Sequence, residues 1–222
     1  MSCRSRLRWY ELIPLISFVV LWGRCKNCKT KISAQYPLVE FITGLIFACL
    51  FLKFRNVFYY NTLLFTLTYA YYAIMFSLLI IVAAYDLRHK IIPDALSLIF
   101  GVLAFAGLFL FAGSSFLLHV PTILEFLSGL LIGLPFALLW IISGGTWMGL
   151  GDAKLALGLG WFLGLAKALP ALLIAFWSGA IIGIMFVILR KGYGMKSEIP
   201  FAPYLIFGAS LAFFFDLHFL RI

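Results

Sequence analysis

Apolar stretches of membrane-spanning length recur along the chain from residue 37 to the end, separated by short polar segments. About 20 apolar residues cross the hydrocarbon core of a bilayer as a helix. The pattern therefore predicts an all-α, polytopic integral membrane protein with about seven transmembrane helices, the fifth of them short. The predicted spans lie near residues 37–54, 62–84, 95–112, 122–143, 153–166, 170–189 and 201–220.

The composition agrees with a membrane location. The chain is 64% hydrophobic and only 11% charged, which is more apolar surface than a soluble single domain can bury. A net charge of +9 would suit a nucleic-acid partner, but the Lys and Arg residues gather in the short segments between apolar stretches. This clustering indicates membrane topology, with the lipid bilayer as partner and no nucleic acid.

The distribution of positive charge also orients the chain. If the first span enters from the cytoplasm, the inner segments hold thirteen of the 17 Lys and Arg residues and the outer segments four. Because inner segments of membrane proteins are enriched in these residues, we expect a multi-pass protein of the cytoplasmic (inner) membrane. The turns with Asp86 and Asp152 then face the cytoplasm together.

Asp86 and Asp152 are the candidate catalytic residues. Both stand where an apolar stretch meets a polar turn, and carboxylates beside hydrocarbon are costly enough to indicate function. Two carboxylates held close push their proton affinities apart, so one can take a proton from water while the other donates one. Such a pair can carry out acid–base catalysis, although its joint titration leaves open which Asp is the base.

Residues 1–36 differ from the rest of the chain because they are basic and contain cysteine. Their apolar stretch at 12–21 is too short to span a bilayer. A secretory signal is an alternative, but no small-residue cleavage site follows. We predict a small cytoplasmic lobe at 1–36 whose apolar side chains dip into the membrane interface, followed by a transmembrane core at 37–222.

Three cysteines of this lobe are candidate metal ligands. Cys25 and Cys28 have the spacing of a two-thiolate clip for tetrahedral zinc, and Cys3 could add a third thiolate. A fourth ligand is not evident, so a structural zinc site and reduced structural thiols both stay open. Cys49 falls within a predicted span and is interpreted as a packing residue.

Several blocks of the sequence resemble, in the same order, those of type IV prepilin peptidases, the bifunctional leader peptidases and N-methyltransferases of type IV pilus and type II secretion systems. The full set is 8–17, 23–28, 36–40, 86–94, 149–154 and 199–204, of which the fourth block begins with Asp86 and the fifth begins with Gly-Leu-Gly-Asp. In two departures, the family pattern starts with an additional helix and a Cys that would precede Cys3, and Ala202 replaces a usual Gly. The chain is therefore expected to be truncated or naturally short.

The resemblance implies an aspartic endopeptidase with Asp86 and Asp152 as catalytic residues. It would cleave the leader of prepilins or pseudopilins after Gly on the cytoplasmic side, and methylate the new N-terminus with S-adenosylmethionine. No Gly-rich nucleotide fingerprint follows a strand, so spacing alone does not identify the cofactor site. Glu40 and Glu198 resemble polar positions of the family and are candidate methyl-transfer or substrate contacts, although helix-start electrostatics also accounts for them.

Four residues near the carboxylates are candidate active-site support. Gly149 and Gly151 would allow a tight turn and close approach of an extended substrate, although Gly is common in membrane helices. Lys154 would orient the carboxylates or, as we favour, anchor the chain at the interface. Asp94 would cap the helix that follows Pro93 and could also line the cleft.

Two other functions are compatible with parts of the pattern. A multispan transporter would relay protons or bind cations through carboxylates, which should then lie in the middle of a span. Another peptidase with a Gly-x-Gly-Asp motif, such as an archaeal preflagellin or signal-peptide peptidase, would share Asp152. The Cys25 and Cys28 clip and the block at 8–17 argue against this second alternative.

Overall fold

The computed structural model describes residues 13–112, 115, 116, 118, 120–189 and 200–218, which leaves Cys3 and Glu198 outside the described ranges. The chain forms two compact units, residues 1–49 and 50–222. The first contains helix α1 (Ile16–Val20), an isolated antiparallel bridge between Arg24 and Lys31, and the first part of helix α2 (Gln35–Tyr60). Cys49 closes this unit as a half-buried residue of α2.

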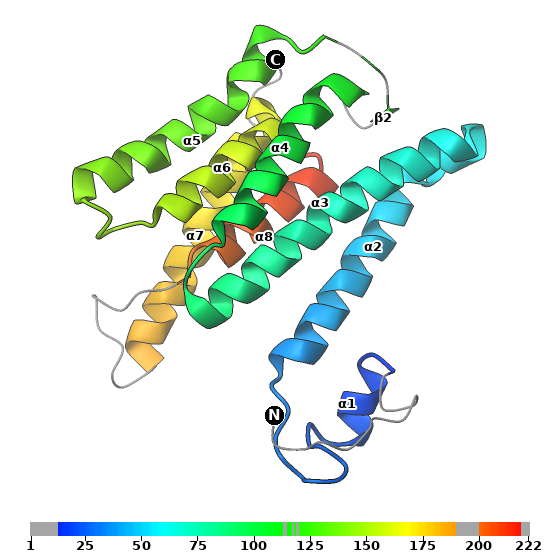
Figure 1. The fold of residues 1–222 in the computed structure, drawn as a ribbon, viewed down its shortest axis with the longest axis vertical. Helices are drawn as coiled ribbons and strands as arrows, with labels where there is room; N and C mark the ends of the chain where they lie inside the picture. Colours follow the sequence, from blue (N-terminus) through cyan, green and yellow to red (C-terminus); the bar gives the residue numbers. More distant parts are fainter. Residues whose placement is uncertain (1–12, 113–114, 117, 119, 190–199, 219–222) are drawn as a thin grey trace. The chain divides into compact units, whose positions relative to one another are not determined.

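The second unit is helical, as predicted, apart from two short strands (Figure 1). Strands β1 and β2 pair antiparallel, with Phe111 opposite Phe116. Helix α6 packs against both α5 and α4, and α7 packs against α8. The elements are the rest of α2, α3 (Thr62–His89), α4 (Asp94–Leu110), β1 (Phe111–Ala112), β2 (Ser115–Phe116), α5 (Ile123–Ser143), α6 (Leu150–Leu163), α7 (Leu165–Leu189) and α8 (Ala202–Phe214).

Local capping interactions explain where the helices begin and end. The Asn61 side chain accepts hydrogen bonds from two backbone N–H groups in the first turn of α3, at 3.0 and 3.1 Å. Thr122 and Glu125 form a reciprocal capping box at the start of α5. Helix α5 ends at Gly144, whose φ of 58° is the left-handed conformation that glycine adopts without strain.

Within the described residues, four helices are long and apolar enough to cross a membrane, namely α2, α3, α5 and residues 165–186 of α7. Helices α4, α6 and α8 are shorter, so the count of seven spans stays a prediction. The predicted boundary near residue 166 is wrong, since α6 already ends at Leu163. Gly164, with φ of 72°, breaks the helix there, and α7 starts five residues before Pro170.

Glycines bring the helices of the second unit into backbone contact. A Cβ atom at Gly160 of α6 would lie 2.6 Å from the Ser128 carbonyl oxygen of α5, and one at Gly208 would overlap the Ala171 carbonyl oxygen of α7. The Ser128 hydroxyl donates a hydrogen bond to the Gly160 carbonyl oxygen at 2.9 Å. Small residues at helix interfaces allow this close packing in membrane proteins.

Aromatic packing and one ion cluster complete the second unit. The Phe213 ring of α8 lies 4.9 Å from Tyr72 of α3 and 5.7 Å from Phe162 of α6, measured between ring centroids. Beyond α8, the Asp216 carboxylate bonds both Lys53, at 2.7 Å, and Lys167, at 2.6 Å. Both lysines come from segments that the charge pattern assigns to the outer side of the membrane.

Candidate active site

Asp86 lies in the last turn of α3 and is buried, with 4% of its surface exposed. Its carboxylate oxygen Oδ2 accepts a hydrogen bond from the backbone N–H of Ala202 at 3.1 Å. Ala202 is the first residue of α8, so the carboxylate sits where a helix presents N–H donors and the positive end of its dipole. Burial of the carboxylate disfavours a negative charge on Asp86, and the Ala202 N–H partly offsets this.

Asp152 lies in the first turn of α6, just before the predicted span at 153–166, and is partly buried. Burial raises the pKa of Asp152 to about 7, the negative charge of Asp86 raises it as well, and a backbone hydrogen bond from Gly149 lowers it. The structure therefore brings the two predicted carboxylates close enough to interact electrostatically. Asp152 therefore takes up a proton at a higher pH than a free Asp does.

Gly151, the residue before Asp152, lies against the segment that follows α3. A Cβ atom at this position would lie 2.8 Å from the Cβ atom of Ile92, which is itself buried. The clash involves an atom fixed to the backbone and cannot be relieved by a rotamer change. Only glycine at position 151 lets the start of α6 approach the α3–α4 connection this closely.

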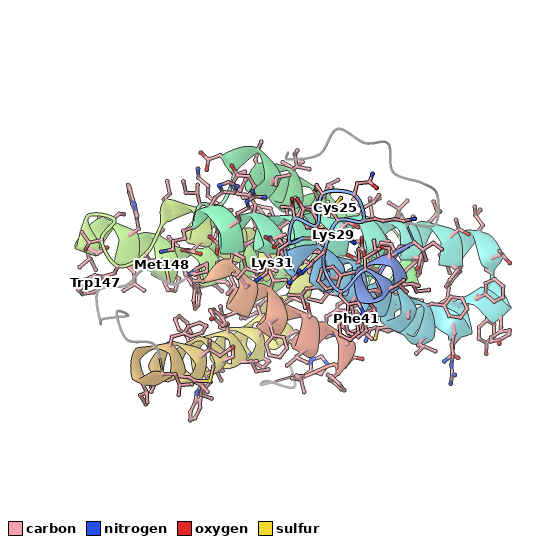
Figure 2. The ribbon with its side chains drawn as sticks, turned by 90° about the horizontal axis from the view of Figure 1, so that it is seen from below. Cys25, Lys29, Lys31, Phe41, Trp147 and Met148 are labelled. Atoms are coloured by element: carbon pink, nitrogen blue, oxygen red, sulfur yellow. The ribbon has the colours of Figure 1, made fainter. Side chains whose placement is uncertain are left out.

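Gly149 has a different environment and does not make the tight turn that the sequence suggested. Its φ of −74° is open to any residue, and a Cβ there would lie in ordinary contact, 3.6 Å from the Asp152 carboxylate. The left-handed turn after α5 is made instead by Gly144 and Gly145, with φ of 58° and 79°. Trp147 and Met148 follow them on this connection to α6 (Figure 2).

Lys154 and Asp94 form an ion pair, with 2.6 Å between Nζ and Oδ1. The predicted capping role of Asp94 is wrong, because Pro93 occupies the N-cap position and the Asp94 side chain makes no capping hydrogen bond. Asp94 is the first residue inside α4 and uses its carboxylate for Lys154 of α6. Both side chains are exposed to water, so the pair adds little stability and instead joins the starts of two helices beside Asp152.

Two family models match the chain. Residues 1–54 match the bacterial peptidase A24 N-terminal domain, and residues 73–184 match the type IV leader peptidase family. The chain belongs to the type IV leader peptidase family. No solved structure is significantly similar to it.

Relatives of this leader peptidase family member are named prepilin leader peptidase/N-methyltransferase. The protein of Xanthomonas campestris is 34% identical over 95% of this chain and 69% of its own length. Those of Myxococcus xanthus and Bacillus subtilis are 32% and 30% identical, over 88% and 96% of this chain and 55% and 79% of their own lengths. The chain thus spans between about half and four fifths of the length of these relatives.

Glu40 belongs to the first unit, where its Oε2 accepts a hydrogen bond from the Leu15 backbone N–H at 2.9 Å. It lies beyond the first turn of α2, so helix-start electrostatics does not account for it. Glu40 lines a cavity of about 210 Å³ together with Phe18, Asn27 and Tyr36. The other predicted contact, Glu198, is outside the described part of the chain.

The predicted zinc ligands are only partly described. Cys25 is half-buried and Cys28 is exposed, with its sulfur 3.1 Å from the Thr30 hydroxyl. Among the residues with described positions, no group of three or more His, Cys, Asp or Glu side chains could hold a metal ion. Cys25 and Cys28 alone therefore do not form a closed zinc site, and Cys3 lies outside the described residues.

Two features of the site were not predicted from the sequence, the Ala202 backbone N–H and the contact between Gly151 and Ile92. Pro203, as the second residue of α8, was a usable signal for a helix start at Ala202, because proline favours the first turn. No local signal pairs that helix start with Asp86. The mid-span carboxylates of a transporter are absent from the described part, where each Asp lies at or near a helix end.

Proposed function

We propose that this protein is a membrane-embedded aspartic endopeptidase that removes the leader of prepilins or pseudopilins, cutting after Gly on the cytoplasmic side. The observation that carries the proposal is the pairing of Asp86 and Asp152, one accepting an N–H at the start of α8 and the other with a raised pKa. The names of the relatives support the substrate class. The charge distribution supports a cytoplasmic-membrane location with the site facing the cytoplasm.

We propose different roles for the two carboxylates, supported by the Ala202 N–H at Asp86 and the raised pKa of Asp152. Ionised Asp86 draws a proton from a water molecule, which attacks the carbonyl carbon of the scissile bond. Protonated Asp152 donates its proton to the carbonyl oxygen, which would otherwise carry the developing negative charge. When the tetrahedral intermediate collapses, the proton taken up by Asp86 passes to the leaving amine, and a hydroxyl of the intermediate returns a proton to Asp152 as the carbonyl bond forms again. Lys154 and Asp94 hold the starts of α6 and α4 together beside this pair.

The function is tested by incubating the purified full chain with a prepilin in lipid. Mass spectrometry should find a new N-terminus directly after the leader Gly. Because the mechanism uses carboxylates, serine-protease inhibitors and chelators should leave cleavage largely intact. Strong inhibition of cleavage by either class of reagent would contradict the proposal.

The rate of cleavage should fall as the pH rises through about 7. Asp152 must be protonated to donate, and its pKa is raised to about 7 by burial first and by Asp86 second. Above that value the protonated fraction, and with it the rate, drops about tenfold per pH unit. Initial rates of cleavage between pH 6 and 9 measure this fall in rate. Thermal stability measured at each pH is the control. A flat profile over the range would assign the donor role elsewhere.

We also propose that the first unit takes part in methylation of the new N-terminus. S-adenosylmethionine would supply an electrophilic methyl group. The cavity beside Glu40, at about 210 Å³, can take part of this cofactor, since Phe18 and Tyr36 can stack on an adenine ring and the carboxylate can attract the cationic part. Transfer of a labelled methyl group to cleaved prepilin tests the activity. Absence of this transfer would contradict the proposed methylation.

A zinc site in the lobe is proposed on Cys25 and Cys28 with Cys3 as a third thiolate. An incomplete set of thiolates should bind zinc more weakly than a closed four-thiolate site. Replacing Cys25 and Cys28 together by Ser should remove bound zinc and loosen residues 13–36, because so small a lobe has little core of its own. Metal analysis and hydrogen exchange measure both effects. A full equivalent of zinc in the double variant would rule out this clip.

A further inference from the structure

A tight turn in the first unit places like charges opposite each other. Arg24 and Lys31 form an antiparallel bridge, and the Cys25 N–H donates to the Thr30 carbonyl oxygen at 2.9 Å. Lys29, labelled with Lys31 in Figure 2, closes the turn with φ of 58°. Like charges directly opposite across a strand pair are destabilising. The turn therefore contains a repulsion that an anion bound beside it would relieve.

Among the described residues from 13 to 39, every charged side chain is positive. Arg24, Lys26, Lys29 and Lys31 are all exposed. Between residues 13 and 39 the sequence contains these four cations and no carboxylate. The nearest acidic residue beyond them, Glu40, already accepts the backbone N–H of Leu15. The local excess of positive charge makes the surface complementary to an anionic partner.

Apolar side chains adjoin the cations on the same surface. Trp22 is 89% exposed, and Val19 and Val20 on α1 are 70% and 68% exposed. Trp22 holds a left-handed backbone conformation, with φ of 52°. Val20 and Trp22 line one shallow depression together with Arg24 and Lys29. An aromatic and aliphatic tip bordered by cations is the combination that binds the interface of anionic membranes.

The position of this turn near the membrane favours lipid as its anionic partner. Helix α2 begins at Gln35, four residues after Lys31, and is long and apolar enough to cross a bilayer. Four extended residues reach at most about 14 Å. The turn is therefore held close to lipid headgroups at all times, whereas any soluble anionic partner would have to compete with them.

We propose that Val19, Val20, Trp22, Arg24, Lys26, Lys29 and Lys31 form a docking face for anionic phospholipid headgroups. Trp22 and the two valines enter the interface, and the four cations contact lipid phosphates. Docking relieves the repulsion between Arg24 and Lys31 and ties the orientation of the first unit to the lipid composition of the membrane. The proposal is independent of the peptidase and methyl-transfer functions.

The test uses the full chain in nanodiscs of phosphatidylcholine alone or with 30% phosphatidylglycerol, read by hydrogen exchange over residues 16–33. Exchange should slow when the anionic lipid is present, and the protection should fade in about 0.5 M salt because charges are then screened. Lys29→Gln with Lys31→Gln should weaken docking by roughly fivefold per charge removed. Arg55→Gln, an exposed cation of the second unit, is the matched control and should leave the protection unchanged.

The double Gln variant should exchange faster than the wild type only in the anionic lipid. In pure phosphatidylcholine it should exchange as slowly as the wild type or more slowly, because the repulsion across the turn is gone. In the anionic nanodiscs it should exchange faster than the wild type. Equal exchange of the wild type in both lipids, or protection produced only by added prepilin or by RNA, would overturn the assignment to lipid. Faster exchange of the variant in both lipids would also overturn it.

Discussion

Replacing Asp86 or Asp152 by Asn is expected to lower the rate of leader cleavage by about 10²- to 10⁴-fold in each variant, the usual contribution of a general acid or base. An amide has nearly the shape of a carboxylate but cannot take or give the proton. An amide at position 152 keeps the site neutral, as protonated Asp152 does, so the Asp152→Asn variant should insert and fold. Cleavage of a prepilin by equal amounts of purified protein measures the loss.

The double variant and a matched control sharpen the result. Because the two carboxylates act as one unit, Asp86→Asn with Asp152→Asn should cost about as much as either change alone. Asp216→Asn makes the same chemical change in a carboxylate that bonds Lys53 and Lys167 rather than the catalytic pair, and should retain cleavage. Wild-type cleavage by either single dyad variant would show that the pair is not catalytic.

Gly151→Ala should lower both stability and cleavage, whereas Gly149→Ala should leave stability near the wild type. At position 151 the added methyl would lie 2.8 Å from the Ile92 Cβ, and overpacking of this kind costs about 1–3 kcal/mol. The start of α6 must then move and carry Asp152 with it. At position 149 the methyl makes only ordinary contacts, 3.6 Å from the Asp152 carboxylate and 3.9 Å from the Gly151 backbone nitrogen. Thermal unfolding and initial rates of both variants separate the two positions.

The same pair of variants tests how the substrate approaches. If Gly149→Ala is stable but cleaves slowly, the added methyl obstructs the peptide rather than the fold. Equal stability of the two variants would mean that the close approach of Gly151 to Ile92 is not required. Local propensity works against the expected difference, because Ala is less favourable than Gly at the N-cap position 149 and more favourable inside the helix at position 151, so a larger loss at 151 reports the contact with Ile92.

The sequence predicted the helical class, the positions of most helices and the two candidate carboxylates. These features depend on apolar length and on the rarity of carboxylates beside lipid, and both can be read locally. The end of α6 was missed because Gly164 ends a helix only through its backbone conformation, and Gly occurs within many of the other helices here. A hydropathy pattern does not distinguish a glycine that packs from one that terminates.

The missed contacts of the site are those that join distant parts of the chain. Asp86 and Ala202 are 116 residues apart, and Lys154 and Asp94 are 60 apart. The sequence identified Lys154 and Asp94 as separate supporting residues, with an anchor and a cap as their favoured roles. Their pairing depends on how α4 packs on α6, which is a property of the folded bundle and not of either segment.

The backbone contacts between helices limit the routes by which a substrate can reach the carboxylates. At Gly160 the backbones of α5 and α6 touch, and at Gly208 those of α7 and α8 touch, so no peptide can pass between either pair without separating them. Asp86 and Asp152 lie at the ends of α3 and α6. We therefore expect the scissile bond to enter from the aqueous end of the bundle, with the apolar helix of a prepilin remaining outside in the lipid.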